Sequence, residues 1–257
     1  MAPYDVIGNV VIVKFPRGMS LKEKKKWGEK FLKEHSSVHS VLEKRGKISG
    51  RLRTPETRWI AGLKTKEALY RENGCEFRLN VDTCYFSPRL SSERSEIAGL
   101  VKKGERVLVM FGGVGVFAVV IAKQKKAKEV VSVELGKAPS KYALENVKRN
   151  KLVAVLSCLQ GDVRRVVPKL KGDFDRIVMA RPNLKDSFLD VAFKKIKKGG
   201  MIYYYGFYSE EDVELMKKMI LDEAKRVHKK VKIVRVKKAG DIGTRKYRYR
   251  VDISVLG

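Results

Sequence analysis

The sequence predicts an α/β protein in which a seven-stranded, mostly parallel, doubly wound (Rossmann-like) sheet follows a smaller α+β domain. Two observations support this fold class. From about residue 96 onward, strand candidates alternate with helix candidates, and a glycine-rich turn follows the first of these strands. Before residue 96 the chain shows short strands and one helix instead. We therefore expect two domains, residues 1–95 and residues 96–257.

The first domain opens with an apolar strand, "DVIGNVVIVKF", over residues 5–15. A helix near residues 20–34 follows, and its apolar side chains share one face: Trp27, Phe31 and Leu32. After several short strands, residues 68–86 predict a hairpin, because Asn73-Gly74 supplies the tight turn that alternating strands favour. These elements form a small α+β unit.

The second domain alternates regularly. Its strand candidates cover residues 106–111, 129–134, 154–159, 174–179, 200–206, 230–237 and 246–254. Its helix candidates cover residues 115–124, 138–150, 162–169, 185–197 and 209–228. The alternation favours parallel strands joined by right-handed crossovers. Because only a short link separates the last two strands, they must pair as an antiparallel hairpin. Seven strands with an antiparallel one at the end are typical of class I methyltransferases, whereas dinucleotide dehydrogenases usually have six parallel strands.

The composition is strongly basic, with 57 Lys and Arg against 29 Asp and Glu, a formal net charge of +28. Self-repulsion of this size favours a polyanionic partner, and nucleic acid fits better than a membrane because no amphipathic anchor helix stands out. No apolar run approaches the roughly 18 residues that span a bilayer, and no signal peptide opens the chain. We expect a cytoplasmic monomer. Three cysteines without CxxC spacing predict neither disulfides nor a metal site.

The glycine turn lies in "RVLVMFGGVGVFAVVIAKQ", residues 106–124, and contains Gly112, Gly113 and Gly115. Glycine lets the backbone approach a ligand closely. Read as GxGxxG, the motif lacks its third glycine, and read as a phosphate loop it lacks the Gly-Lys-Ser/Thr ending. These departures argue against both a dinucleotide and a nucleoside triphosphate as the ligand. A nucleoside ligand without a pyrophosphate remains, and S-adenosylmethionine fits.

Two acidic residues support this ligand. Glu134 ends the second strand in "VVSVELGKAP", where a carboxylate accepts hydrogen bonds from ribose hydroxyls. Asp162 follows the third strand in "LQGDVRR", where it can meet the adenine edge. The alternative interpretations are a solvated glutamate and a helix N-cap aspartate. Because three features follow three successive strands, we favour the binding site.

Several segments together carry a resemblance that covers nearly the whole chain: "YDVIGNVVIV", "VLEKRGKISGRLRTPETRWIAG", "YRENGCEFRLNVDTCYFSPRLSSER", "VMFGGVGVFAVVIAK", "VELGKAPSKYALENVKRNK", "GDVRRVV", "DRIVMARPN" and "GGMIYYYGF". In these segments the sequence resembles the archaeal and eukaryotic tRNA (guanine-37-N1)-methyltransferases and the related wybutosine-synthesis aminocarboxypropyl transferases. The resemblance implies S-adenosylmethionine as the donor and the tRNA anticodon arm as the partner. Fuller members carry a further N-terminal domain that grips the tRNA elbow, and the resemblance implies that this sequence corresponds to the domains after it.

The resemblance also implies roles for individual residues. Arg53 in "SGRLRTPE" matches the catalytic arginine, Glu93 in "SSERSE" the general base, and Tyr85 in "CYFSPRL" a third catalytic position. The implied donor-binding residues are Tyr85, Arg89, Met110, Phe111, Gly112, Gly113, Gly115, Glu134, Leu135, Gly161, Asp162, Val163 and Ala180. The implied substrate-binding residues are Arg53, Arg181, Pro182 and Asn183.

The chemistry explains these residue types. Guanine N1 carries a proton that must leave before the nitrogen attacks a sulfonium methyl, and a carboxylate can take it. Negative charge then develops on O6, where a guanidinium stabilises it, and no metal is needed. The alternatives are a phosphate-binding Arg53, a capping or surface Glu93, and a Tyr85 that fills an apolar seam. Of the tyrosine run 203–205, we expect two to lie in the core.

The sequence departs from the family pattern at positions where other residues are common: Val109, Gly112, Val116, Gly136 and Ala180. Gly112 and Val116 predict a looser glycine turn, and Ala180 replaces an asparagine expected to contact the target guanine. Three functions stay open: N1-methylation of guanosine 37, aminocarboxypropyl transfer to a wyosine precursor at that position, and RNA binding without catalysis. The proton that must leave N1 favours methylation.

Overall fold

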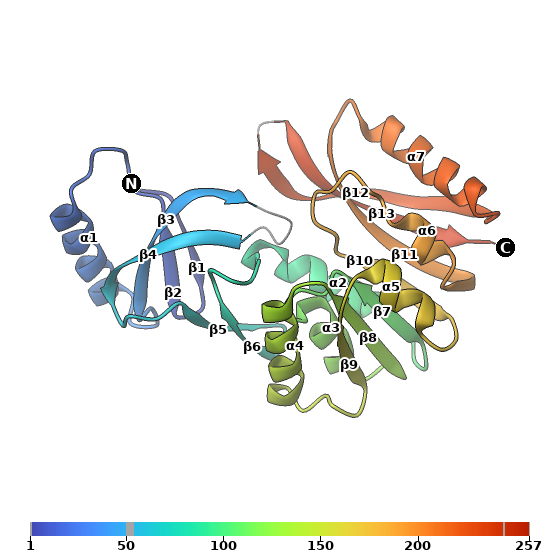
Figure 1. Ribbon diagram of the computed structural model, residues 1–257, viewed down its shortest axis with the longest axis horizontal. Helices are drawn as coiled ribbons and strands as arrows, with labels where there is room; N and C mark the ends of the chain where they lie inside the picture. Colours follow the sequence, from blue (N-terminus) through green and yellow to red (C-terminus); the bar gives the residue numbers. More distant parts are fainter. Residues whose placement is uncertain (1, 50–53, 244, 257) are drawn as a thin grey trace. The chain divides into compact units, whose positions relative to one another are not determined.

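The computed structural model describes residues 2–49, 54–243 and 245–256. The chain divides into two compact units, Met1–Pro88 and Arg89–Gly257 (Figure 1). The boundary predicted after residue 95 falls inside helix α2 (Ser91–Leu100), which belongs to the second unit. The proposed catalytic and donor-binding residues of the resemblance are therefore divided between the units.

The first unit contains a sheet with the order β1-β2-β3-β4 among the described residues: β1 (Tyr4–Ile7), β2 (Val10–Val13), β3 (Ser40–Ser49) and β4 (Thr54–Gly62). The single strand predicted over residues 5–15 is wrong, because β1 and β2 form an antiparallel pair joined through Gly8. Gly8 has a φ of +57°, and an added Cβ would lie 1.7 Å from the Leu69 carbonyl oxygen. Only glycine fits this turn.

Helix α1 (Leu21–Glu34) confirms the predicted helix. Ser20 caps it: its hydroxyl accepts from the backbone N–H of Glu23, whose side chain accepts from the backbone N–H of Ser20. Phe31 lies in the core of this unit, and Trp27 and Leu32 pack against that core. The apolar face was therefore predicted correctly.

The predicted hairpin is also present, as β5 (Glu67–Glu72) and β6 (Cys75–Asn80). Asn73 and Gly74 connect the strands with φ angles of 48° and 69°, the left-handed conformation that two-residue hairpin turns require. The second strand ends at Asn80, whereas the prediction extended it to residue 86.

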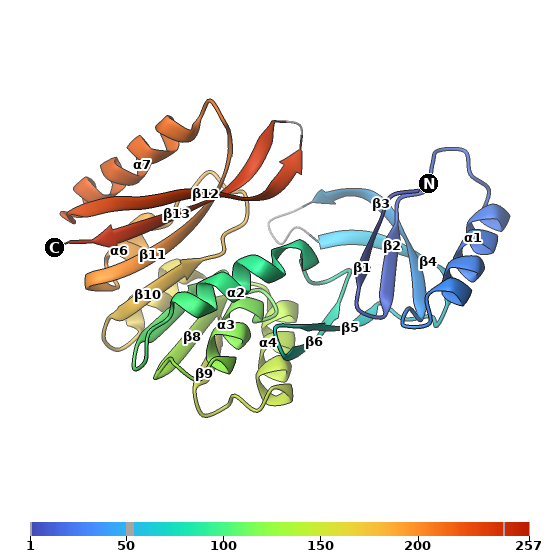
Figure 2. The ribbon, with the colours of Figure 1, turned by 180° about the vertical axis from the view of Figure 1, so that it is seen from behind.

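The second unit contains, within its described residues, a seven-stranded sheet with the order β12-β13-β11-β10-β7-β8-β9 (Figures 1 and 2). Its strands are β7 (Arg106–Met110), β8 (Glu129–Glu134), β9 (Leu156–Gln160), β10 (Phe174–Met179), β11 (Ile196–Ser209), β12 (Val231–Gly243) and β13 (Lys246–Val255). Strands β7 to β11 pair in parallel, and β13 pairs antiparallel with both β11 and β12. The predicted fold class and terminal antiparallel hairpin are confirmed.

The connecting helices are α3 (Val116–Lys123), α4 (Lys137–Arg149), α5 (Val163–Val166), α6 (Leu189–Phe193) and α7 (Val213–Arg226). The helix predicted over residues 185–197 is wrong in length. Phe188 adopts a left-handed φ of 58°, so α6 begins only after it, and β11 already begins at Ile196. In the part of the chain that the structure describes, no helix has the length and apolarity needed to cross a membrane.

The two faces of this sheet differ. On one face, Leu108, Met110, Ile177 and Tyr204 join apolar residues of α5, α6 and α7 in a buried core. Because successive strand residues point to opposite faces, Arg176, Tyr203, Tyr205, Arg250 and Asp252 lie on the other face, toward α2 and α3. This second face holds the polar network described below.

Candidate active site

The glycine turn between β7 and α3 is built for a close backbone approach. Gly113 and Gly115 have left-handed φ angles of 56° and 84°. An added Cβ on Gly112 would lie 2.0 Å from the Ser132 hydroxyl on β8. The turn packs directly on Ser132, and a residue with a Cβ at position 112 would overlap that hydroxyl. The expectation that Gly112 loosens the turn stays a prediction.

The carboxylate of Glu134 lies beside this turn, at the end of β8. Its Oε2 accepts from the backbone N–H of Gly113 at 2.9 Å, and its Oε1 accepts from that of Gly136 at 2.7 Å. A carboxylate has about four acceptor positions, so about two remain. They match the two vicinal hydroxyls of a ribose. The half-buried Glu134 is thus an oriented acceptor, unlike a solvated strand-end acid.

The third strand ends next to the same place. The backbone N–H of Gly161 donates to the Glu134 carbonyl oxygen at 2.8 Å, which holds the turn after β9 against the end of β8. Asp162 follows and caps α5, where its Oδ1 accepts from the backbone N–H of Arg164 at 2.9 Å. The N-cap interpretation is therefore confirmed for one oxygen. The adenine contact stays a prediction.

The loop after β10 is held from inside by Arg181. This side chain is 4% exposed and donates to the Tyr204 hydroxyl at 3.1 Å and to the Asp186 carbonyl oxygen at 2.6 Å. Among the residues that the structure describes, its Nε has no hydrogen-bond partner. Arg181 thus braces its own loop, whereas Pro182 is half-buried and Asn183 is exposed.

The same loop is held from outside by Arg164. Its guanidinium donates to both carboxylate oxygens of Asp186 and also pairs with Asp190 at 2.8 Å. Phe188, the residue before α6, packs edge-on against Phe111 of the glycine turn with ring centroids 5.0 Å apart. The loop after β10 therefore contacts the turn after β7.

Most predicted donor-binding residues of the second unit gather at the carboxyl ends of β7, β8, β9 and β10: Met110, Phe111, Gly112, Gly113, Gly115, Glu134, Leu135, Gly161, Asp162, Val163 and Ala180. The side chains of Met110 and Val163 are buried in the apolar core, so only their backbone atoms can face a ligand. Arg89 opens this unit and is exposed. Tyr85 is exposed and belongs to the first unit, and Arg53 lies outside the described residues.

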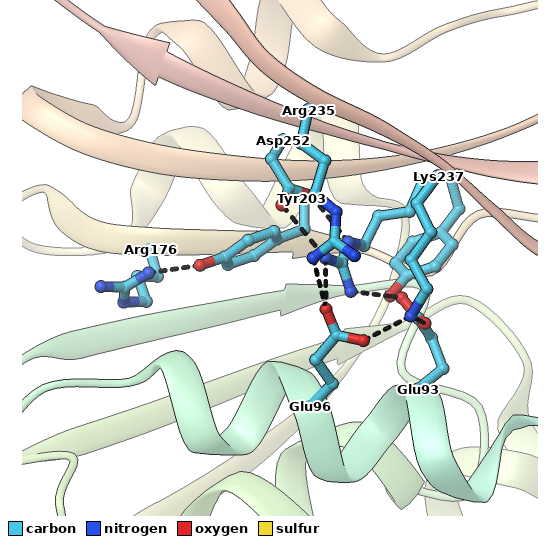
Figure 3. A network of polar contacts seen from close by, with 9 residues as sticks. Glu93, Glu96, Arg176, Tyr203, Arg235, Lys237 and Asp252 are labelled. Carbon is cyan, nitrogen blue, oxygen red and sulfur yellow. Dashed lines mark hydrogen bonds and ion pairs between the residues drawn. The ribbon is translucent and has the colours of Figure 1, made fainter.

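Glu93, the predicted base, lies in a buried polar network and is 5% exposed (Figure 3). Its Oε1 accepts from the Tyr205 hydroxyl at 2.8 Å and from Arg250 Nη1 at 2.7 Å. Its Oε2 accepts from Lys237 Nζ at 2.9 Å. The alternatives of a surface acid and a helix-capping acid are therefore wrong. Its role as a base stays a prediction.

Arg250 is at the centre of this network and has no exposed side-chain surface. It also donates to Glu96 and to Asp252, each at 2.7 Å. Two cations of β12 complete the group, since Arg235 and Lys237 both pair with Glu96. Among the described side chains, Glu93, Glu96 and Asp252 thus face Arg235, Lys237 and Arg250, and the charges balance.

The network shifts the pKa values of two of its members. Hydrogen bonds from Arg250 and then Lys237 lower the pKa of Glu96 from 4.5 to about 2. Burial, followed by the neighbouring Glu93 carboxylate, raises the pKa of Tyr205 well above its usual value, so its hydroxyl stays a donor. All three tyrosines of the run 203–205 are buried, one more than predicted.

This network was missed in the sequence. One signal was available: Arg250 and Asp252 are two residues apart in a strand, so they share a face, and that strand was predicted to pair inside a sheet. In the described part of the chain, this network included, no group of three or more His, Cys, Asp or Glu side chains is arranged to hold a metal ion.

Comparisons with known proteins also divide the chain in two, but they place the boundary between residues 65 and 68, ahead of the β5–β6 hairpin, whereas the structural units divide after Pro88. The family model described as "TRM5/TYW2 methyltransferase domain" matches residues 68–236, and the model described as "TYW2 N-terminal domain" matches residues 2–65. Both models concern the same group of enzymes.

The chain is 39% identical over 209 residues to the tRNA (guanine(37)-N(1))-methyltransferase Trm5b of Pyrococcus abyssi, which covers 81% of this chain and 61% of that protein. It is 32% identical over 303 aligned positions to the tRNA (guanine(37)-N(1))/4-demethylwyosine(37)-methyltransferase Taw22 of Nanoarchaeum equitans, covering 98% of this chain and 99% of that protein.

Solved structures agree with this assignment. The crystal structure of Pyrococcus abyssi Trm5b is 34% identical with a TM-score of 0.88, covering 99% of this chain and 75% of that one. The structure of M. jannaschii TYW2 in complex with AdoMet is 25% identical with a TM-score of 0.76, covering 99% of each chain. The chain therefore belongs to the TRM5/TYW2 methyltransferase family.

Proposed function

We propose that this protein transfers a methyl group from S-adenosylmethionine to N1 of guanosine 37 in tRNA. The observation that carries the proposal is the 39% identity, over 81% of the chain, to a tRNA (guanine(37)-N(1))-methyltransferase. The chain spans 61% of that relative, so the reaction and substrate are inferred from the shared part.

The residues at the carboxyl edge of the sheet fit the donor. Glu134 keeps about two acceptor positions for the ribose hydroxyls, because backbone N–H groups of Gly113 and Gly136 occupy the others. The glycine turn brings backbone atoms to the same edge without side chains. When bound, the donor supplies an electrophilic methyl group on a sulfonium, so the protein chiefly positions the two reactants.

Glu93 is the proposed acceptor of the N1 proton. Two of its three donors, Tyr205 and Arg250, are buried and hold Oε1. Oε2 accepts only from Lys237 among the described residues, and the Lys237 side chain is 30% exposed. Oε2 is therefore the oxygen that can take the proton, provided that Lys237 moves aside. Arg53 is proposed to stabilise the charge on O6.

A second candidate is methylation of 4-demethylwyosine at the same tRNA position. It is favoured by coverage: the chain spans 76% of the tRNA 4-demethylwyosine(37)-methyltransferase Taw21 of Saccharolobus solfataricus, against 61% of Trm5b. Taw22, of which the chain spans 99%, is named for both reactions. The relatives also include a tRNA(Phe) (4-demethylwyosine(37)-C(7)) aminocarboxypropyltransferase of Methanocaldococcus jannaschii, which is 33% identical over 81% of this chain.

The test offers methyl-labelled S-adenosylmethionine with tRNA transcripts that differ only at position 37, together with a tRNA that carries 4-demethylwyosine there. Nucleosides are then analysed by mass spectrometry. We expect 1-methylguanosine from the G37 transcript and no product from the A37 transcript. If the G37 transcript stays unmodified while the tRNA that carries 4-demethylwyosine is methylated, the second candidate is correct. If the product carries an aminocarboxypropyl group in place of a methyl group, both candidates are wrong.

A further inference from the structure

We propose that the far end of the C-terminal hairpin binds the RNA substrate. We define the hairpin end as residues 238–243 of β12, Arg245, and residues 246–249 of β13. This inference rests on the proposed function, because it assigns a surface to the tRNA. It concerns binding, so it can be tested even if the transferred group or target base differs.

The base of the hairpin is held firmly. Next to the hairpin end, Lys237 on β12 and Arg250 on β13 pair with Glu93 and Glu96 of α2 in the buried network (Figure 3). The third strand of this region also supports it, since β11 pairs with β13 from Met201 through Ser209. A strand pair that is fixed at its base presents its far end as a preorganised surface.

The hairpin end is strongly basic. Its cations are Lys238, Arg245, Lys246 and Arg248, and its acid is Asp241. Lys238 pairs with Glu210, which precedes α7. Arg245 and Lys246 are exposed, and neither forms an ion pair with a residue that the structure describes. These two side chains are therefore available to phosphate groups.

Two of these cations lie against aromatic rings. Lys238 Nζ lies 4.1 Å from the ring centroid of Tyr247, and the guanidinium of Arg248 lies 5.2 Å from that of Phe207 on β11. Tyr247 and Phe207 are half-buried, whereas Tyr249, whose ring is 6.1 Å from that of Tyr247, is buried in the core and supports Tyr247 from below. Cations that follow a backbone, together with aromatic rings on which bases stack, are typical of single-stranded nucleic-acid binding surfaces.

The test measures tRNA binding by fluorescence anisotropy over a series of salt concentrations. The test protein is the double variant Arg245→Gln/Lys246→Gln. Its matched control is Lys225→Gln/Lys230→Gln, which removes the same charge from exposed residues before the start of β12. We expect the test variant to bind more weakly and the magnitude of its log–log salt slope to fall by about 1.4, since each phosphate contact on a single strand contributes about 0.7. The control should match wild type.

A second variant, Tyr247→Leu, separates stacking from charge. It should weaken tRNA binding by a similar factor at every salt concentration, because stacking releases no counterions. In all variants the affinity for S-adenosylmethionine, measured by calorimetry, should be unchanged.

The inference is overturned if Arg245→Gln/Lys246→Gln keeps the wild-type affinity and slope, or if the control loses as much. Loss of binding to phosphatidylserine vesicles with unchanged tRNA binding would assign the surface to membranes instead. If wild-type protein binds tRNA at the hairpin end but modifies no position 37, the proposed function fails and this inference stands.

Discussion

The two ends of the C-terminal hairpin carry the same kinds of residue in opposite settings. At the base, Arg235, Lys237 and Arg250 face the carboxylates of α2 and β13, and Arg250 is completely buried. At the far end, Arg245 and Lys246 are exposed and lack ion-pair partners among the described residues. The cations behind the net charge of +28 therefore differ in their surroundings and do not form one uniform basic surface. Some cations stabilise the fold, and others remain available to a polyanion.

The largest expected effect separates catalysis from folding at the base. Glu93→Gln should lower the single-turnover rate by about 10²- to 10⁴-fold, because an amide cannot take the N1 proton. Glu96→Gln is the matched control, since Glu96 lies one turn away and contacts the same Arg250 and Lys237. It should keep a rate near wild type. Equal rates for the two variants would show that Glu93 is only structural.

Removing the central cation should have the next largest effect, this time on stability. Arg250→Met leaves Glu93, Glu96 and Asp252 without their shared partner, so we expect the free energy of unfolding to fall by about 3–5 kcal/mol. At the far end, Arg245→Met should change it by less than about 0.5 kcal/mol. Urea denaturation measures both. A similar loss in the two variants would contradict the distinction between the ends.

Lowering the pH should reduce the free energy of unfolding by a smaller amount, through Glu96 at the base of the hairpin. Arg250 holds the pKa of Glu96 at about 2, below the ordinary value of 4.5. Because the folded pKa is the lower one, this carboxylate contributes stability above pH 4.5 that is lost as the pH falls toward 2. Urea midpoints should therefore fall more steeply over this interval in wild type than in Glu96→Gln. Parallel curves would argue against a lowered pKa.

Much of the fold was predictable from local patterns. Alternating strands and helices in the second unit gave the sheet class, and Asn73-Gly74 gave the hairpin turn, because both signals depend on neighbouring residues. The errors arose where distant contacts decide. Gly8 splits a predicted strand because Leu69 approaches its backbone, and Phe188 shortens a helix by adopting a left-handed conformation.

The candidate site was predictable in part for the same reason. Glu134 and the glycine turn follow strand ends, and the carboxyl ends of parallel strands meet at one edge of a sheet. The environment of Glu93 could not be foreseen in this way, because its partners Tyr205, Lys237 and Arg250 come from three later strands. Only the order of those strands brings them to α2.

The claim that the carboxyl edge of the sheet binds S-adenosylmethionine is tested most directly by calorimetry on wild type, Glu134→Gln and Glu129→Gln. Glu129 is the matched control, because it lies at the other end of β8 and pairs with Arg106. We predict that wild type and Glu129→Gln bind the donor equally and that Glu134→Gln binds about 10- to 100-fold more weakly, the loss of hydrogen bonds to a charged group. Unchanged binding by Glu134→Gln, or no binding by wild type, would contradict the account.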